Sequence, residues 1–565
     1  MYSSGEIPVL DFKATVPAFL RRQVSLHGQR DFVVTADSRL GYLEAERESA
    51  RLARGLLAAG VGKGSRVGLL APNGPAWVVA WLAVARLGAL LVPLNTFSKA
   101  RELGWMLRHA DVQLLLCVDS FLGHDYLARL EEAAPSLTAA ENAELLLLPE
   151  LPMLRRVYAW GDGRRKWLAG AVEELAESGD VPEQDEGFLS RVEDSVETSD
   201  PMLVVYSSGS TADPKGAVHG QGSLLLHAFN LNTFRGLRAD DRLYSPMPFF
   251  WVGGFVFALL AAMHAGSCLL CEESFEPGRT LDLLEHERAT FVTGWPHYGK
   301  AMADHESFAG RDLSSLRGGN VYDLLPPGVA PEDPELRANS LGMTETGGPH
   351  TMYDMTVDLP DSLRGSFGCP VPGLEHKLVD PDSGLELAGM NDRSAGEKSA
   401  GEAGEICVRG YSLMQGLYKQ QRDSVFDEAG WYHTGDGGSF NEQGHLFFEG
   451  RLGDVIKTGG ANVSPREVEV LLEAVDGVKA AHVVGLPDPD RGQTVAAVVL
   501  LKQGVELDGE QLLAALRDEL SAYKLPRQIF FLGENELPMT DSGKIKKSAL
   551  VGQLQDLFKA GRGGA

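Results

Sequence analysis

Apolar and polar positions follow two different periods along residues 44 to 118. The segment "EAERESARLARGLLAAG" (44–60) has apolar residues at helical spacing and ends on Gly60, and "PAWVVAWLAVARLGA" (75–89) is helical in the same way. Short apolar runs of strand length lie between and after them, at 65–72, 90–95 and 111–118. Strand, helix and strand in this order predict right-handed crossovers in a parallel sheet.

Two later stretches have a different pattern. From about 365 to 450, short apolar segments alternate with Gly and Asp turns, which predicts a small β-rich subdomain. After Arg451 the chain continues with strands and helices over about a hundred residues, followed by a polar tail. That length is enough for a small α/β domain of its own.

The composition is that of a globular chain with an acidic surface. Of 565 residues, 44% are hydrophobic and 23% charged, and 78 acidic against 52 basic side chains give a net charge of −26. This length predicts about three or four folding units. The charge repels nucleic acid and anionic lipid, so we expect neither as a partner, and an anionic small molecule needs a local positive site.

Cysteine usage and apolar runs indicate a cytoplasmic enzyme or binding protein. The five cysteines are scattered, and we expect the pair in "CLLC" (268–271) to be buried strand thiols rather than a zinc or redox site. The first residues lack the pattern of a signal peptide. The longest apolar run (253–270) is interrupted by His264, Gly266 and Ser267, so we expect no membrane span.

A hydroxyl-rich loop, "YSSGSTADPKGA" (206–217), is a candidate for the positive site. Five hydroxyl-bearing residues fill its first six places, and Lys215 follows. An apolar strand (201–210) precedes the loop and a helix-like segment (222–234) follows, which is the setting of phosphate-binding loops. Hydroxyls, backbone N–H groups and a lysine all donate to phosphate oxygens. The alternative is a solvated surface turn.

The loop and four further motifs resemble those of the adenylate-forming (ANL) superfamily. That superfamily includes acyl-CoA synthetases, non-ribosomal adenylation domains and beetle luciferases, and its phosphate loop reads Tyr-Thr-Ser-Gly-Thr-Thr-Gly-x-Pro-Lys-Gly. The other motifs, in the order of the superfamily, are "LGMTET" (341–346), "WYHTGD" (431–436), "GRLGDVIKTGGANVSPREVE" (450–469) and "LPMTDSGKIKK" (537–547). They cover most of the chain, which is similar to an acyl-CoA synthetase or other AMP-dependent ligase.

The resemblance implies a fold and a domain division. We expect an α/β protein with a large N-terminal adenylation domain of several subdomains (1–451), made of parallel sheets with helices and a small β-barrel-like subdomain (about 365–450). A small mobile α/β lid domain (452–565) follows. The resemblance places the hinge near Gly453, and a glycine allows wide backbone rotation there.

The resemblance also implies a reaction in two steps. A carboxylate attacks the α-phosphorus of ATP to give an acyl-adenylate and pyrophosphate, and a thiol, usually that of coenzyme A, then displaces AMP. The implied catalytic residues are Lys544, which bridges the carboxylate and the α-phosphate, Thr344, which donates to that phosphate, and Glu345, which ligates Mg²⁺. The expected cofactors are therefore ATP and Mg²⁺, with coenzyme A as co-substrate.

The implied nucleotide and coenzyme contacts come from the same motifs. Asp436 would accept from the ribose hydroxyls, Arg451 would reach the same ribose, and pantetheine would pass Gly459 and Gly460. The remaining implied contacts are Ser207, Ser208, Gly209, Ser210, Thr211, Lys215, Leu341 and Gly342. Two departures stand out: Ala212 occupies a glycine position of the loop, and Leu341 replaces an aromatic that would stack on adenine.

An apolar acyl pocket is expected around "SPMPFFWVGGF" (245–255). Trp251 takes the place of a histidine usual in the superfamily, and with Phe249 and Phe250 it would form an aromatic wall. Gly253, Gly254, Gly318 and Gly319 carry no side chains to fill the space opposite. The alternative is ordinary core packing. These stretches show no lysine or arginine for a second carboxylate, which favours a hydrophobic monocarboxylic acid.

These observations favour an ATP-dependent acyl-CoA synthetase that acts on a small-molecule carboxylic acid. Alternatives are an acyl-AMP ligase that loads a carrier protein, a luciferase-type oxygenase, and a nucleotide-binding regulatory protein that has lost catalysis. Relatives include dimers, so a homodimer is possible.

Overall fold

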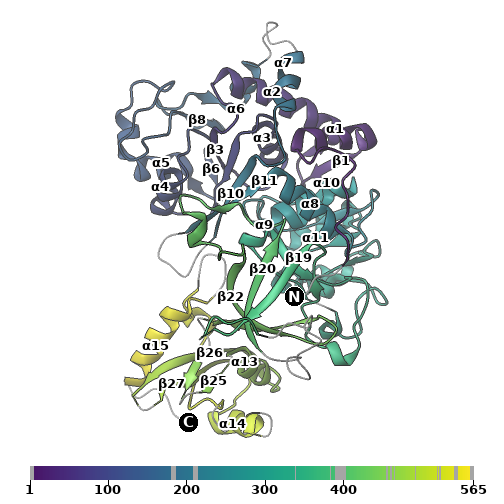
Figure 1. Ribbon diagram of the computed structural model, residues 1–565, viewed down its shortest axis with the longest axis vertical. Helices are drawn as coiled ribbons and strands as arrows, with labels where there is room; N and C mark the ends of the chain where they lie inside the picture. The colour runs from purple at the N-terminus through teal and green to yellow at the C-terminus, as the bar shows by residue number, and fades with distance from the viewer. Residues whose placement is uncertain are drawn as a thin grey trace. The chain divides into compact units, whose positions relative to one another are not determined.

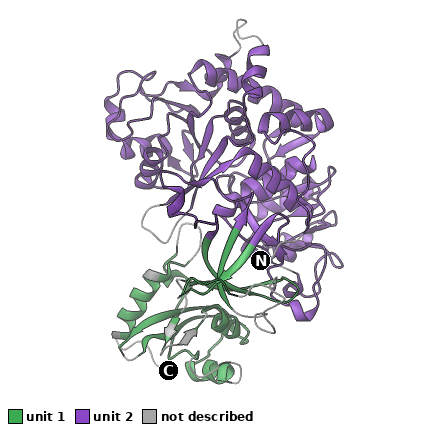
Figure 2. Cartoon of the chain, viewed as in Figure 1, with its two compact units in different colours: residues 1–2, 376–408, 433–565 green, residues 3–375, 409–432 purple. Residues whose placement is uncertain are grey.

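The computed structural model divides into two compact units, which Figure 2 colours separately. The larger unit comprises residues 3–375 and 409–432, and the smaller comprises 376–408 and 433–565. The predicted β-rich subdomain (365–450) is therefore shared between the two units, and the boundary expected at Arg451 stays a prediction. The residues described are 5–179, 186–207, 214–337, 339–381, 383–387, 403–452, 456–458, 461–463, 465–489, 491–517, 520, 524–539 and 545–559.

An eight-stranded sheet forms one half of the larger unit (Figure 1). Its strands, in spatial order, are β21 (Gly416–Leu417), β11 (Lys215–Gly220), β10 (Pro201–Ser207), β4 (Leu90–Pro93), β3 (Arg66–Leu70), β5 (Leu114–Val118), β8 (Arg156–Trp160) and β9 (Gly170–Ala171). The pairs from β10 to β9 are parallel, whereas β11 is antiparallel to both of its neighbours. The parallel pairing predicted for the strands of residues 44 to 118, with helices between them, is confirmed.

Helices cover both faces of this sheet, so its strands are apolar on both sides. Leu69 and Leu203 face a core with the helices α2 (Tyr42–Ala58), α3 (Pro75–Arg86) and α8 (Gln221–Asn232). Leu70 and Val204, the next residue along each strand, face a second core with α4 (Ala100–His109) and α5 (Tyr126–Ala133). Alternating side chains therefore enter different cores, as expected for a buried parallel sheet.

A six-stranded sheet forms the other half of the larger unit. Its order is β15 (Gly318–Gly319), β14 (Phe291–Val292), β12 (Arg242–Tyr244), β13 (Cys268–Leu270), β1 (Asp31–Val34) and β2 (Arg39–Gly41). Leu269 shares the first core with Leu69, so that helical core lies between the two sheets. Leu270 faces a third core with α11 (Pro277–His286) and α12 (Pro296–Ala303). Cys268 and Cys271 are buried free thiols, as predicted.

The described residues of the smaller unit make up most of one sheet and all of another. One has the order β19 (Leu374–Val379), β20 (Gly404–Gly410), β22 (Tyr432–Phe440) and β23 (Leu446–Arg451); the other joins β25 (Ala461–Val463), β24 (Ile456–Thr458), β27 (Gly492–Leu501) and β26 (Val478–Asp488), with β28 (Gln528–Phe531) beside β27. The helices α13 (Pro465–Glu473) and α14 (Gly509–Arg517) pack on one face of the second sheet. The helix α15 (Lys547–Lys559) packs on its other face.

Two predictions about local structure were wrong. The hydroxyl-rich loop does not lead directly into a helix, because β11 intervenes and pairs with β10 before α8 begins. The polar tail contains a strand, β28, and a helix, α15, whose Leu550 and Leu554 are buried. Both segments are short or mixed in polarity, so their pairing depends on partners distant in sequence. Within the described residues, no helix combines the length and apolarity that crossing a membrane requires.

Candidate functional site

Several predicted site residues fall outside the described part of the chain. They are Ser208, Gly209, Ser210, Thr211, Gly459, Gly460 and Lys544. The departure at Ala212 and the expected hinge at Gly453 lie outside it as well. The roles assigned to these residues stay predictions, and the site is built below from the residues beside them.

The two ends of the hydroxyl-rich loop meet across a pair of antiparallel strands. Ser207 ends β10 and lies opposite Lys215, which begins β11. The residue before Ser207 is anchored by its side chain, since the hydroxyl of Tyr206 and Nδ1 of His109 are 2.8 Å apart. Ser207 and Lys215, which flank the undescribed part of the loop, are therefore direct neighbours in the sheet.

The turn that carries Thr344 and Glu345 packs against β10. A 3-10 turn, η6 (Thr344–Thr346), follows β16 (Leu341–Met343) and leads into β17 (Gly348–Met352), and β10 contacts this turn. The hydroxyl of Thr346 donates to the carbonyl of Gly348 over 2.7 Å and thereby closes the turn. Gly347 has a φ of +71°, and a Cβ there would meet Leu224 and the carbonyl of Ser412. A side chain at that position would displace both catalytic candidates.

A buried histidine holds the carbonyl of Thr344. One ring nitrogen of His219, on β11, donates to that carbonyl over 2.7 Å, and burial lowers the pKa of His219 to about 4. The ring is therefore neutral at physiological pH, with its proton on the nitrogen that faces Thr344. The carbonyl of Glu345 accepts from the backbone N–H of Met414 over 2.8 Å. No periodic pattern in the sequence points to His219, because its role depends on contact with the turn η6, more than a hundred residues away.

Buried histidines should make the larger unit sensitive to acid. Burial lowers the pKa of His227, His264 and His350 to about 3 in each case, below the ordinary 6.5. The unfolded chain therefore binds more protons, so the stability that these neutral rings contribute is present above about pH 6.5 and is lost as the pH falls toward about 3. Urea unfolding at several pH values should show this decline.

A single replacement tests whether buried neutral histidines cause this loss of stability in acid. His264 stacks on Phe19 with ring centroids 4.2 Å apart, so His264→Phe keeps an aromatic ring there and removes the titrating group. Its free energy of unfolding should fall less steeply with acid than that of the native chain. The exposed His286, replaced by glutamine, serves as the control and should leave the slope unchanged. An unchanged slope in His264→Phe would contradict the argument.

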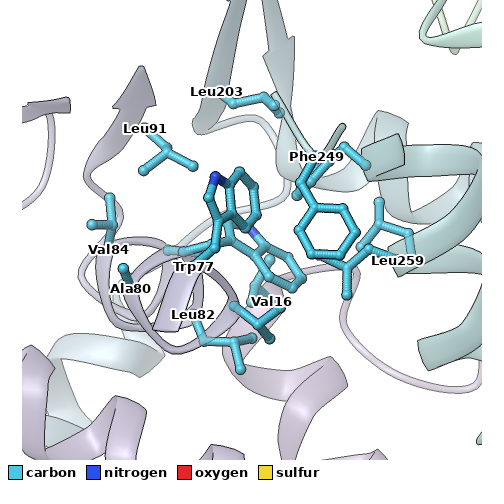
Figure 3. Close-up of a cluster of buried hydrophobic side chains, with 14 of the residues drawn as sticks. Val16, Trp77, Ala80, Leu82, Val84, Leu91, Leu203, Phe249 and Leu259 are labelled. Carbon is cyan, nitrogen blue, oxygen red and sulfur yellow. The ribbon is translucent and has the colours of Figure 1, made fainter. Parts of the chain in front are cut away.

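The predicted acyl wall divides into a core residue and a more open cluster. Phe249 is fully buried, and the centroid of its ring lies 5.3 Å from that of Trp77. Figure 3 shows the two side chains together in a cluster of buried hydrophobic residues. Asn73 fixes this segment, because its side chain accepts from the N–H of Phe249 over 2.8 Å and donates to the carbonyl of Met247 over 3.0 Å. Packing between the two sheets therefore explains why a phenylalanine stands at position 249, and its part in substrate binding stays a prediction.

Phe250 and Trp251 belong to an aromatic cluster that extends toward the surface. Their rings are 5.1 Å apart, and Trp251 also contacts Phe97 and Trp295 at 6.3 and 6.0 Å. Phe97 and Trp295 are 44% and 38% exposed, so the cluster has an accessible side. Neither residue was predicted from the sequence, although Trp295 lies between Gly294 and Pro296, shortly after β14, where a turn is expected.

The four glycines assigned to the pocket have structural reasons of their own. A Cβ at Gly254 would overlap the carbonyl of Pro248, and one at Gly319 would overlap the carbonyl of Val292. A Cβ at Gly318 would lie 2.7 Å from the ring of Phe291, and at Gly253 one would lie 3.1 Å from Sδ of Met247. Close approach of neighbouring groups therefore requires glycine at three of these positions, and their part in substrate binding stays a prediction.

The two ribose candidates meet in the smaller unit. Asp436 on β22 lies directly opposite Arg451 on β23, and Nε of Arg451 is 2.8 Å from Oδ1 of Asp436. The Asp436 side chain is 6% exposed, whereas that of Arg451 is 59% exposed. The hydroxyl of Thr434 supports the carboxylate's position, since it accepts from the N–H of Asp436 over 3.0 Å. A carboxylate held in this position beside an exposed guanidinium can accept from two hydroxyls of a sugar.

Two family models match the sequence. Residues 20–418 match the model of the AMP-binding enzyme, and residues 467–544 match that of the AMP-binding enzyme C-terminal domain. A feruloyl-CoA synthase from an Amycolatopsis species is 31% identical, with 90% of this chain and 92% of that protein covered. The mitochondrial medium-chain acyl-CoA ligase ACSF2 of Bos taurus is 29% identical, with 92% of this chain and 83% of that protein covered.

Solved structures agree on the fold. The crystal structure of the anthranilate CoA ligase AuaEII in complex with anthranoyl-AMP has a TM-score of 0.78 and 23% sequence identity, with 98% of this chain and 99% of that chain covered. The mixed α/β architecture with a separate C-terminal domain is thereby confirmed.

Proposed function

This chain belongs to the AMP-binding enzyme family of the adenylate-forming superfamily, and from that membership we propose that it activates a hydrophobic monocarboxylic acid with ATP and transfers the acyl group to coenzyme A. It is an AMP-forming acid–thiol ligase. The observation that supports the proposed site most directly is the contact of β10, which leads into the hydroxyl-rich loop, with the turn that bears Thr344 and Glu345.

The chemical problem of the first step is the approach of an anion to a polyanion. An oxygen of the substrate carboxylate forms a bond to the α-phosphorus, and the bond from that phosphorus to the bridging oxygen of pyrophosphate breaks. Lys215, the loop hydroxyls and Thr344 would donate to the phosphate oxygens as their negative charge shifts. The thiol of coenzyme A would then attack the acyl carbonyl, lose its proton, and release AMP.

Glu345 fits the role of a magnesium ligand. Its side chain is partly exposed beside the turn η6, and a carboxylate together with phosphate oxygens is how proteins usually hold this ion. When bound, Mg²⁺ neutralises phosphate charge. The backbone carbonyl of Glu345 accepts a hydrogen bond from the N–H of Met414, and this bond holds the backbone from which the carboxylate extends.

The aromatic cluster of Phe97, Phe250, Trp251 and Trp295 supports a hydrophobic acyl group. It offers a partly accessible apolar surface, and flat rings pack well against alkyl or aromatic chains.

A pyrophosphate-exchange panel tests the proposal. The purified chain, ATP and Mg²⁺ are mixed with fatty, aromatic, polycyclic and dicarboxylic acids, and exchange of labelled pyrophosphate into ATP is measured. Exchange with apolar monocarboxylic acids and little with dicarboxylic ones is expected. Exchange restricted to charged acids would reject the hydrophobic pocket, and ATP binding without exchange for any acid would favour the regulatory alternative.

The acceptor is tested separately. Steady release of AMP should require coenzyme A, because the acyl-adenylate otherwise stays bound. AMP release that requires a carrier protein and ignores coenzyme A would favour the acyl-AMP ligase.

Leu341→Tyr should tighten ATP binding roughly tenfold, because an aromatic ring stacks on adenine where leucine gives only apolar contact. Leu341 is 9% exposed at the start of β16 and pairs with Thr351 on β17, so the position is held firmly. The dissociation constant for ATP should be measured by isothermal calorimetry. Leu341→Ala is the control and should weaken binding; equal or weaker binding by a folded Leu341→Tyr chain would contradict the stacking argument.

A further inference from the structure

The smaller unit contains three metal-ligating side chains of different chemistry at one place on its first sheet. Glu405 and Cys407 lie two residues apart on β20, so they share a face, and His433 lies on the neighbouring strand β22. One ligand atom from each residue lies within 4.8 Å of the other two. None of these side chains has a part in the proposed ligase reaction.

One nitrogen atom is the centre of the group. Nδ1 of His433 is 3.4 Å from Sγ of Cys407 and 2.8 Å from Oε2 of Glu405. This ring nitrogen therefore lies close to both the thiol and the carboxylate, as a shared ligand atom would.

We propose that Glu405, Cys407 and His433 form a binding site for a borderline-soft divalent cation, with Zn²⁺ as the best match. Zinc is held tetrahedrally by thiolate, imidazole and carboxylate, and bond lengths of about 2.3 Å to sulfur and about 2.1 Å to nitrogen or oxygen place those ligand atoms about 3.4–3.6 Å apart. The observed distance from Cys407 to His433 already has this value. The distance between Nδ1 of His433 and Oε2 of Glu405, now 2.8 Å, must widen by about 0.6 Å.

The surroundings hold the ligands in place and leave a way in. Oε1 of Glu405 accepts from the backbone N–H of Gly435 over 3.0 Å, which leaves Oε2 directed at His433. Cys407 is fully buried, whereas the His433 side chain is 41% exposed. An ion can therefore arrive from the solvent side with a water molecule as its fourth ligand.

The charges balance when the ion is bound. Cys407 loses its thiol proton to solvent, and the resulting thiolate and the Glu405 carboxylate together neutralise the two positive charges of the ion, while His433 ligates as a neutral ring. No redox step is involved. Because Cys407 loses a proton when the ion binds, binding should release protons to the solvent.

Cobalt is the probe for the first test, since a thiolate bound to Co²⁺ gives a charge-transfer absorption band that oxygen ligands do not. The full-length chain, reduced and free of nucleotide, is titrated with Co²⁺. One equivalent should produce the band, and Zn²⁺ should then abolish it. Binding of Co²⁺ at Glu345 cannot produce this band, because Glu345 offers only oxygen. Absence of the band would therefore leave the ligase proposal intact, and absence of pyrophosphate exchange would leave the metal-site proposal intact.

Three variants locate the site. Cys407→Ser should lose the band, and His433→Gln should weaken Co²⁺ binding at least about 100-fold. Cys369→Ser is the matched control, because Cys369 is a partly buried thiol in the other unit and should bind as the native chain does. Because His433 is partly exposed, His433→Gln keeps the proposal testable if Cys407→Ser, at a buried position, fails to fold. Circular dichroism would reveal such a failure.

Three results would overturn the proposal. They are the absence of the band in the native chain, a band of equal intensity in folded Cys407→Ser, and unchanged affinity in His433→Gln. Any of these would reduce the group to a hydrogen-bonded cluster that joins β20 to β22.

Discussion

Replacing Lys544 with alanine should lower acyl-adenylate formation at least about 100-fold while sparing thioester formation from supplied acyl-adenylate. The proposed role explains this difference, because the ammonium group is needed where two anions approach each other in the first step. In the second step a neutral acyl carbonyl accepts the thiol, so the same charge contributes little. Pyrophosphate exchange measures the first step, and thioester formation from synthetic acyl-AMP and coenzyme A measures the second.

A lysine two residues away provides the control. Lys546 is exposed, so Lys546→Ala should change neither step. Equal losses of both steps in Lys544→Ala would indicate a general structural role, and normal adenylation would remove Lys544 from the reaction.

The second large effect concerns stability. Arg86→Leu should lower the free energy of unfolding of the larger unit by about 3 kcal/mol, because it removes the buried counter-charge of Glu193 and leaves that carboxylate only the half-exposed Arg21 as an ionic partner. Nε of Arg86 on α3 is 2.6 Å from Oε1 of Glu193, and their side chains are 5% and 4% exposed. The same guanidinium donates to the hydroxyl of Ser49 and to Oε1 of Glu46 on α2, each over 2.9 Å.

Urea unfolding measures this loss, and two further variants show its origin. Arg21 also pairs with Glu193, but its side chain is 46% exposed, so Arg21→Leu should cost about 1 kcal/mol or less. Adding Glu193→Gln to Arg86→Leu should recover part of the loss, since the uncompensated charge is then removed. A loss below about 1 kcal/mol in Arg86→Leu would show that water reaches Glu193 in the variant.

Local sequence predicted the first half of the fold well. Residues 44 to 118 carry strong helical and strand periods, and each expected element is present within a few residues of its predicted ends. Such periods depend only on which side of an element faces the core. The strand β11 was missed for the opposite reason: six residues with two glycines become a strand because β10 and β21 lie on either side.

The motifs determined the superfamily and the type of reaction, since they fix residue types at set spacings before any contact is known. Among the motif members that the structure describes, Ser207 lies opposite Lys215, Thr344 precedes Glu345 in one turn, and Asp436 lies opposite Arg451, while their roles in adenylation stay predictions. No motif could show that Phe249 is core or that His219 holds the carbonyl of Thr344.

The sequence by itself thus determined the family, the elements with clear periodicity and the residues available for adenylation. Tertiary structure alone decided which buried rings are neutral, why glycine is required beside Pro248 and Val292, and how Glu405 and Cys407 come to face His433. The physical reason is that periodicity and residue type are local properties, whereas burial, ion pairing and ligand geometry depend on distances between residues that only the folded chain brings together.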